Sequence, residues 1–133
     1  MAVRFYLARA PSESPTRSSS KSWLPPIKVA HFTSFSGREF DPTFSPDGNQ
    51  IAFIWDGVKG DNFDIYVKLI NAGTPLRLTT HPGVDHSPAW SPDGRYIIYE
   101  RWDESGRLDI WLYNLKMKKT YPIATNAGEP SWY

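Results

Sequence analysis

The chain has 133 residues, with 15 Lys and Arg against 14 Asp and Glu, and it contains no cysteine. The length is that of one ordinary domain, and the lack of cysteine excludes disulfide bonds, thiolate metal sites and a thiol nucleophile. The net charge of +1 provides no global field that would concentrate nucleic acid or an anionic membrane, so we expect neither as a partner. The sequence also lacks a run of the ~20 apolar residues that a membrane-spanning helix requires.

The first 26 residues differ in composition from the rest. Positions 11–26 are rich in serine and proline, and the basic residues of the segment outnumber its single acidic residue, Glu13. Too few apolar side chains are present to offset the entropy of ordering such a segment. We therefore predict that residues 1–26 are a disordered, basic tail or linker.

The rest of the chain contains an internal repeat. Ser45-Pro46-Asp47-Gly48 recurs 46 residues later as Ser91-Pro92-Asp93-Gly94, and a third copy begins at Pro130-Ser131-Trp132. We predict two complete repeats at 41–86 and 87–129. The last strand and loop of a preceding repeat are expected at 27–40, and the start of a following repeat at 130–133.

Each repeat is predicted to form four strands. Short runs rich in Ile, Val, Tyr, Trp and Phe alternate with clusters of Gly, Pro, Asp and Asn, and helical periodicity is absent. The strands expected in the first repeat are Asp41–Phe44, Gln50–Trp55, Asp64–Leu69 and Leu76–Thr79. Those expected in the second are Ser87–Trp90, Tyr96–Trp102, Asp109–Leu115 and Thr120–Ala124.

The repeat also predicts how the strands are joined and stacked. Ser-Pro-Asp-Gly suits a type I turn between the first strand and the second. The middle strands are apolar on both alternating faces, which indicates sheets covered on both sides. Four antiparallel strands with a period in the mid-forties are typical of β-propeller blades. The predicted fold is therefore all-β, with two complete blades and partial strands of the flanking ones.

These motifs resemble the WD40-like repeat of the TolB-like β-propeller family. The resemblance rests on Pro-Thr-Phe-Ser-Pro-Asp-Gly and Asp-Ile-Tyr-Val in the first repeat, and on Pro-Ala-Trp-Ser-Pro-Asp-Gly and Asp-Ile-Trp-Leu in the second. It implies a propeller of about six blades that serves as a binding platform, usually in a bacterial periplasmic or other extracytoplasmic setting. Related repeats form sensor parts of membrane-anchored regulators and gating propellers of serine peptidases.

A search for catalytic chemistry yields no candidate. The sequence contains no Gly-x-Ser-x-Gly, Gly-x-x-x-x-Gly-Lys or His-Glu-x-x-His motif. We interpret His81, Asp85 and His86 as a polar loop between blades rather than a metal site, and the Asp56–Asn62 loop as a turn rather than a calcium site. Asp64 and its repeat Asp109 are expected to accept structural hydrogen bonds. We expect no enzyme activity, cofactor or metal.

The leading hypothesis is a platform that binds a protein partner or small ligand at the mouth, meaning the end of the blades where each first strand begins. The candidate binding residues there are Arg38, Glu39, Asp41, Asp85, His86 and Ser87. The alternatives are the sensor part of a membrane-anchored bacterial transcriptional regulator or kinase, and the accessory propeller of a serine peptidase. Two blades do not close a ring, so we expect Phe44 and Trp90 to be exposed, and either missing blades or self-association to complete it.

Overall fold

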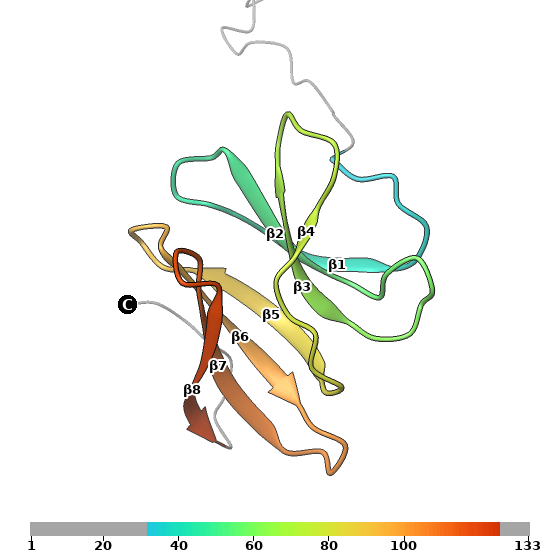
Figure 1. The fold of residues 1–133 in the computed structure, drawn as a ribbon, viewed down its shortest axis with the longest axis vertical. Helices are drawn as coiled ribbons and strands as arrows, with labels where there is room; N and C mark the ends of the chain where they lie inside the picture. The colour runs from blue at the N-terminus through green and yellow to red at the C-terminus, as the bar shows by residue number, and fades with distance from the viewer. Residues whose placement is uncertain (1–31, 126–133) are drawn as a thin grey trace, which may run out of the picture. The chain divides into compact units, whose positions relative to one another are not determined.

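The computed structural model describes residues 32–125, which form two four-stranded antiparallel sheets (Figure 1). The strand order is β1-β2-β3-β4 in the first sheet and β5-β6-β7-β8 in the second. Each sheet is therefore a meander in which consecutive strands pair, as the repeat predicted. The strands are β1 (Glu39–Phe44), β2 (Gln50–Trp55), β3 (Asp64–Leu69), β4 (Leu76–Arg77), β5 (Val84–Trp90), β6 (Tyr96–Trp102), β7 (Leu108–Asn114) and β8 (Lys119–Thr125).

The first strand of each sheet begins earlier than predicted. β1 starts at Glu39 and β5 at Val84, because each strand continues across a proline through a bulge. Asp41 and Ser87, the residues before those prolines, occupy the same repeat position and adopt positive φ values of 51° and 50°. The bulge lets pairing resume on the far side of a residue that lacks an N–H group.

The fourth strand of the first sheet is shorter than predicted. β4 ends at Arg77 rather than Thr79, although the Leu78 N–H still donates to the carbonyl of Ile65 at 2.8 Å. The Ile65 N–H donates instead to the side-chain Oγ1 of Thr79 at 2.9 Å. A hydroxyl thus replaces a backbone acceptor at this point of the ladder. The predicted tail, residues 27–31 of the preceding repeat and the start of the third copy lie outside the described residues.

Both Ser-Pro-Asp-Gly segments form the predicted turns. The Gly48 N–H donates to the Ser45 carbonyl at 2.8 Å, and Gly94 repeats this bond to Ser91 at 2.9 Å. Both glycines have positive φ, near 70°, which a residue without a Cβ adopts at little cost. The serine hydroxyl accepts a backbone N–H from the start of the next strand and donates to the turn aspartate. One hydroxyl therefore links the two strands that the turn joins.

The hydrogen bonds of the second Ser-Pro-Asp-Gly turn predict how its aspartate, Asp93, titrates. Hydrogen bonds from the Ser91 hydroxyl and the Arg95 N–H lower the pKa of Asp93 from 3.8 to about 2. A lowered pKa stabilises the fold above the ordinary value, and this contribution is lost as the pH falls from 3.8 toward 2. NMR titration of the carboxyl should give that low value in the wild type and a higher one in Ser91→Ala. Ordinary titration in both proteins would contradict the turn geometry.

The main core lies between the two sheets. Ile54, Ile65 and Val67 of the first sheet belong to one buried cluster with Ile97 and Tyr99 of the second. A smaller cluster on the other face of the first sheet contains Ile51, Phe53, Trp55 and Tyr66, with Phe35 packed against it. The predicted burial of both faces is thus confirmed for the first sheet.

The innermost strands differ in exposure. Phe44 of β1 is 53% exposed, whereas Trp90, at the same repeat position in β5, is only 8% exposed. The Trp90 indole N–H donates to the carbonyl of Thr43 at 3.2 Å, because β5 packs against the first sheet (Figure 1). The prediction of exposure is confirmed for Phe44 and wrong for Trp90. Within residues 32–125, no helix is long and apolar enough to cross a membrane.

Candidate functional site

The mouth end of β1 is fixed by an ion pair. The Arg38 backbone N–H donates to Asp56 Oδ1 at 2.7 Å, and its Nε donates to Oδ2 at 2.9 Å. Asp56 follows the last residue of β2, and its side chain is only 4% exposed, while that of Arg38 is 65% exposed. The hydrogen bonds from the Arg38 backbone and side chain lower the pKa of Asp56. The pair therefore links both the backbone and the guanidinium of Arg38 to Asp56, while the arginine side chain stays largely exposed.

Aromatic rings gather beside this guanidinium. The Arg38 guanidinium carbon lies 5.0 Å from the ring centroid of Phe63, within reach of a cation–π interaction. Phe63 also contacts Phe40, with centroids 5.8 Å apart, and His86, with centroids 6.2 Å apart. Phe40 remains 51% exposed. We call Arg38, Phe40, Phe63 and His86 the mouth cluster; it joins β1, the β2–β3 loop and β5.

The two bulges lie next to the mouth cluster. The Ser87 N–H donates to Asp41 Oδ2 at 3.3 Å, so the bulge of one sheet is bonded to the bulge of the other. The Ser87 hydroxyl also lies 3.4 Å from Glu100 Oε2. Left-handed backbone at a non-glycine residue costs about 1–2 kcal/mol. The bond between the bulges helps to maintain that conformation at the point where the sheets meet.

Asp85 is buried in an ion pair with Arg101. Its side chain is 0% exposed and forms a bidentate pair with Arg101, whose Nε and Nη2 donate to the carboxylate at 2.7 and 2.9 Å. Burial alone would lower the pKa of Arg101, but the hydrogen bonds and charge of Asp85 raise it. The carboxylate of Asp85 offers no surface to a partner, so its contribution would be to position Arg101.

Glu39 carries an unusual acceptor. One carboxylate oxygen, Oε1, is buried, and none of the residues in the described range donates a hydrogen bond to it. Glu39 lies opposite Trp55 in the ladder, at the start of β1. A buried acceptor without a donor costs about 1–3 kcal/mol.

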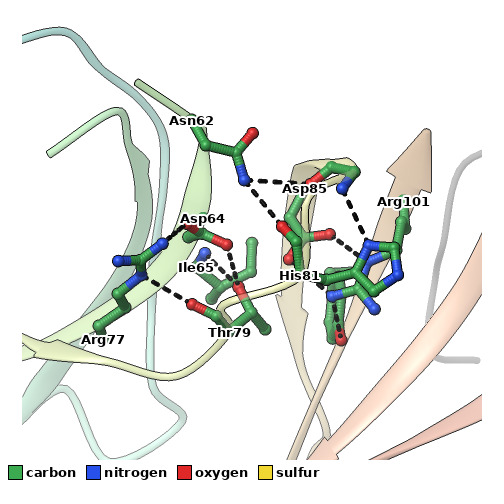
Figure 2. A network of polar contacts seen from close by, with 10 residues as sticks. Asn62, Asp64, Ile65, Arg77, Thr79, His81, Asp85 and Arg101 are labelled. Atoms are coloured by element: carbon green, nitrogen blue, oxygen red, sulfur yellow. Dashed lines mark hydrogen bonds and ion pairs between the residues drawn. The ribbon is translucent and has the colours of Figure 1, made fainter. Parts of the chain in front are cut away.

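Figure 2 shows that Asn62, His81 and Asp85, which were weighed as metal ligands, bond to other protein groups. Asn62 Nδ2 donates to the His81 carbonyl at 2.8 Å, and the Nδ1 atom of His81 accepts the Gly83 N–H at 2.9 Å. Asp64 accepts hydrogen bonds from Thr79 and Arg77, which confirms its predicted structural role. Burial raises the pKa of Asp64 despite these partners. Between residues 32 and 125, no three His, Asp or Glu side chains are grouped to hold a metal ion.

The structure brings Arg38, Glu39, Asp41, His86 and Ser87 to one end of the sheets, although their predicted role as binding residues stays a prediction. The aromatic members Phe40 and Phe63 were not among the predicted binding residues. The equivalent positions in the second repeat are His86 for Phe40 and Leu108 for Phe63, so neither phenylalanine is conserved between the two repeats. That departure from the repeat is the signal that could have identified them.

The sheets, turns and repeat register match a known family. The model for the TolB beta propeller domain matches residues 20–132. The chain belongs to the TolB β-propeller domain family.

Curated relatives share the repeats of this TolB-family chain but are much longer. An uncharacterized protein of Agrobacterium fabrum is 38% identical over 68% of the chain and 29% of its own length. The uncharacterized peptidase YuxL of Bacillus subtilis is 41% identical over 46% of the chain and 9% of its own length. The Tol-Pal system protein TolB of Rhizorhabdus wittichii is 45% identical over 55% of the chain and 17% of its own length. The chain thus spans less than a third of these relatives.

Solved structures show the same fold. TolB from Acinetobacter baumannii superposes with a TM-score of 0.60 at 21% identity, over 71% of this chain and 23% of that one. The tricorn protease superposes with a TM-score of 0.54 at 20% identity, over 75% of this chain and 9% of that one. The two sheets are therefore blades of a β-propeller, present here as part of a propeller domain.

Proposed function

We propose that this TolB-family chain is a non-catalytic platform that captures a protein partner at the mouth cluster. The observation that carries the proposal is the exposed ring of Phe40 against Phe63, whose ring also lies under the Arg38 guanidinium that Asp56 holds in place. Phenylalanine and arginine are enriched in protein interfaces, and arginine is frequent among the few residues that dominate binding energy. The name of the relative in Rhizorhabdus wittichii, Tol-Pal system protein TolB, also supports a partner of this kind.

The geometry of the mouth favours a protein over a small ligand. The hollow lined by Arg38, Asp56 and Phe63 has a volume of about 90 Å³. Sites that enclose small organic molecules measure about 300–1,000 Å³. An exposed ring and guanidinium beside a shallow hollow suit a side chain or backbone presented by another protein.

A matched pair of phenylalanines tests the proposal. Phe40 and Phe44 lie on the same strand and are 51% and 53% exposed, but only Phe40 belongs to the mouth cluster. We expect Phe40→Ser to weaken partner capture by about tenfold or more, the loss of one interface hot spot. Phe44→Ser should change capture by less than about twofold, as a residue outside the hot spot does.

The measurement is affinity capture with the full chain from an extract of its source organism, followed by titration of the captured protein. Thermal unfolding of both variants provides the control, because their similar exposure predicts similar, small changes in melting temperature. Equal loss of capture in the two variants would contradict a binding site at the mouth. A parallel loss of capture and folding in Phe40→Ser alone would assign that ring to packing.

A second candidate function is that of an accessory propeller of a peptidase, favoured by the 41% identity with the peptidase YuxL over 61 residues. On this alternative, the mouth would face a hydrolase domain of a longer protein. Assay of the complete gene product with a chromogenic peptide substrate distinguishes the two functions. Hydrolysis that changes in Arg38→Ala would favour the accessory role, and a protein partner without hydrolysis would favour the platform.

A further inference from the structure

A larger cleft lies away from the mouth cluster. It has a volume of about 640 Å³ and runs between the link from β4 to β5, at positions 78–82, and the outer strands of the second blade. Its size falls within the range of about 300–1,000 Å³ that is typical of sites for organic ligands. None of the four residues of the mouth cluster lines it. It is therefore a second candidate site, independent of the proposed function.

The charge of this cleft has one sign. Arg101, Lys118 and Lys119 contribute to its lining, and no Asp or Glu is present among its described lining residues. The guanidinium of Arg101 is already neutralised by its bidentate pair with Asp85. The two lysines have no ion pair with any residue between 32 and 125. The cleft thus presents two uncompensated positive charges.

The walls of the cleft combine further donors with apolar surface. His81 accepts the Gly83 N–H through Nδ1, so the proton of its neutral ring is on Nε2 and Nε2 is a donor. Leu78 and Trp111 provide the apolar part of the lining. The indole N–H of Trp111 is buried, and none of the described residues accepts its hydrogen bond. A ligand with both an acidic and an apolar part would match these walls.

The turn that carries the lysines is strained at one of them. Lys118 adopts a φ of 54°, a left-handed conformation that glycine adopts more easily. Its N–H donates to the Asn114 carbonyl at 2.8 Å, and Asn114 Oδ1 accepts the Met117 N–H at 2.9 Å. The turn therefore forms despite the side chain at position 118. The lysine costs stability at this position, so a role outside folding would account for its presence.

We propose that this cleft binds carboxylate groups of an acidic peptide segment. Lys118 and Lys119 would pair with the carboxylates, and an intervening apolar side chain would pack against Leu78 and Trp111. The volume of the cleft is larger than an inorganic anion requires, which favours an organic ligand over free phosphate. A small dicarboxylic acid offers the same carboxylate chemistry without the apolar part, and it is the alternative source that the experiment must distinguish.

Isothermal titration calorimetry of the full chain with a Glu-Leu-Glu peptide, blocked at both termini, tests this proposal. Lys118→Gly combined with Lys119→Gln is expected to weaken binding by about tenfold or more, because two charge-assisted contacts are lost. Lys118→Gly also removes the left-handed strain, so its melting temperature should equal or exceed that of the wild type. Lys116→Gln removes one charge from the same turn outside the cleft, and it should leave binding within about twofold of the wild type.

Three further probes decide the outcome. A blocked Gln-Leu-Gln peptide should not bind measurably, and neither succinate nor inorganic phosphate should compete with the acidic peptide at equal concentration. Equal binding of the glutamine peptide would overturn the role of the carboxylates. Equal competition by succinate would show that the ligand is a small acid rather than a peptide. Competition by phosphate would show that binding rests on general charge attraction and would overturn the proposal. Binding that the double variant leaves unchanged would place the peptide elsewhere.

Discussion

Replacing Arg101 by methionine is expected to lower the free energy of unfolding by about 3–5 kcal/mol, the cost of leaving a buried carboxylate without its partner. The side chains of Arg101 and Asp85 are 6% and 0% exposed, and the guanidinium also stacks 4.8 Å from the ring centroid of Trp111. Urea unfolding followed by circular dichroism measures the change.

The double variant Asp85→Leu with Arg101→Met separates the ion pair from the packing. Replacing a whole buried pair with apolar residues is often neutral, so the double variant should be more stable than Arg101→Met alone. The coupling energy of the pair is the loss of stability in the double variant minus the sum of the losses in Asp85→Leu and Arg101→Met. Additive losses from the two single variants would contradict a direct pairing of these side chains.

Replacing Trp90 by alanine is expected to cost about 3–5 kcal/mol, as truncation of a buried aromatic residue does. Phe44→Ala, at the same position of the first repeat, should change stability by only about 0.5 kcal/mol, as expected for an exposed residue. The contrast arises because Trp90 is 8% exposed between the blades while Phe44 is 53% exposed. Equilibrium unfolding in urea compares the two variants directly.

Trp90→Phe serves as the intermediate case. It keeps a ring between the blades but loses the hydrogen bond from the indole N–H to the Thr43 carbonyl. A loss of about 0.5–1.5 kcal/mol is expected for that bond. Equal effects of Trp90→Ala and Phe44→Ala would contradict the asymmetry between the repeats, and hence the packing of the second blade against the first.

The repeat was sufficient to predict the number and order of the strands, because the same turn and strand motifs occur twice at a nearly constant spacing. Each Ser-Pro-Asp-Gly turn marks the end of one strand and the start of the next, and both copies form the same bonds. The starts of β1 and β5 were missed for a physical reason. Pro42 and Pro88 lack an N–H and so suggest the end of pairing, whereas the left-handed residues before them let the ladder continue.

The candidate site was only partly predictable. Polar residues near the mouth were found from their place in the repeat, but the burial of Asp85 depends on Arg101, which lies opposite it in the β5–β6 ladder. That pairing follows from the register of the hairpin and could have been anticipated. The departure of Phe40 and Phe63 from the repeat marks these two positions, but it does not show that Phe63 contacts both Phe40 of its own blade and His86 of the next blade.

Site-specific photo-crosslinking tests the central claim, capture of a protein at the mouth cluster, most directly. A benzoylphenylalanine placed at Phe40 in the full chain reports on the mouth, and the same group at Phe44 reports on the opposite end of the strand. We predict a crosslink to one partner protein from position 40 that Arg38→Ala diminishes, and none to that partner from position 44. Equal crosslinking from both positions, or crosslinking from position 44 alone, would contradict the claim.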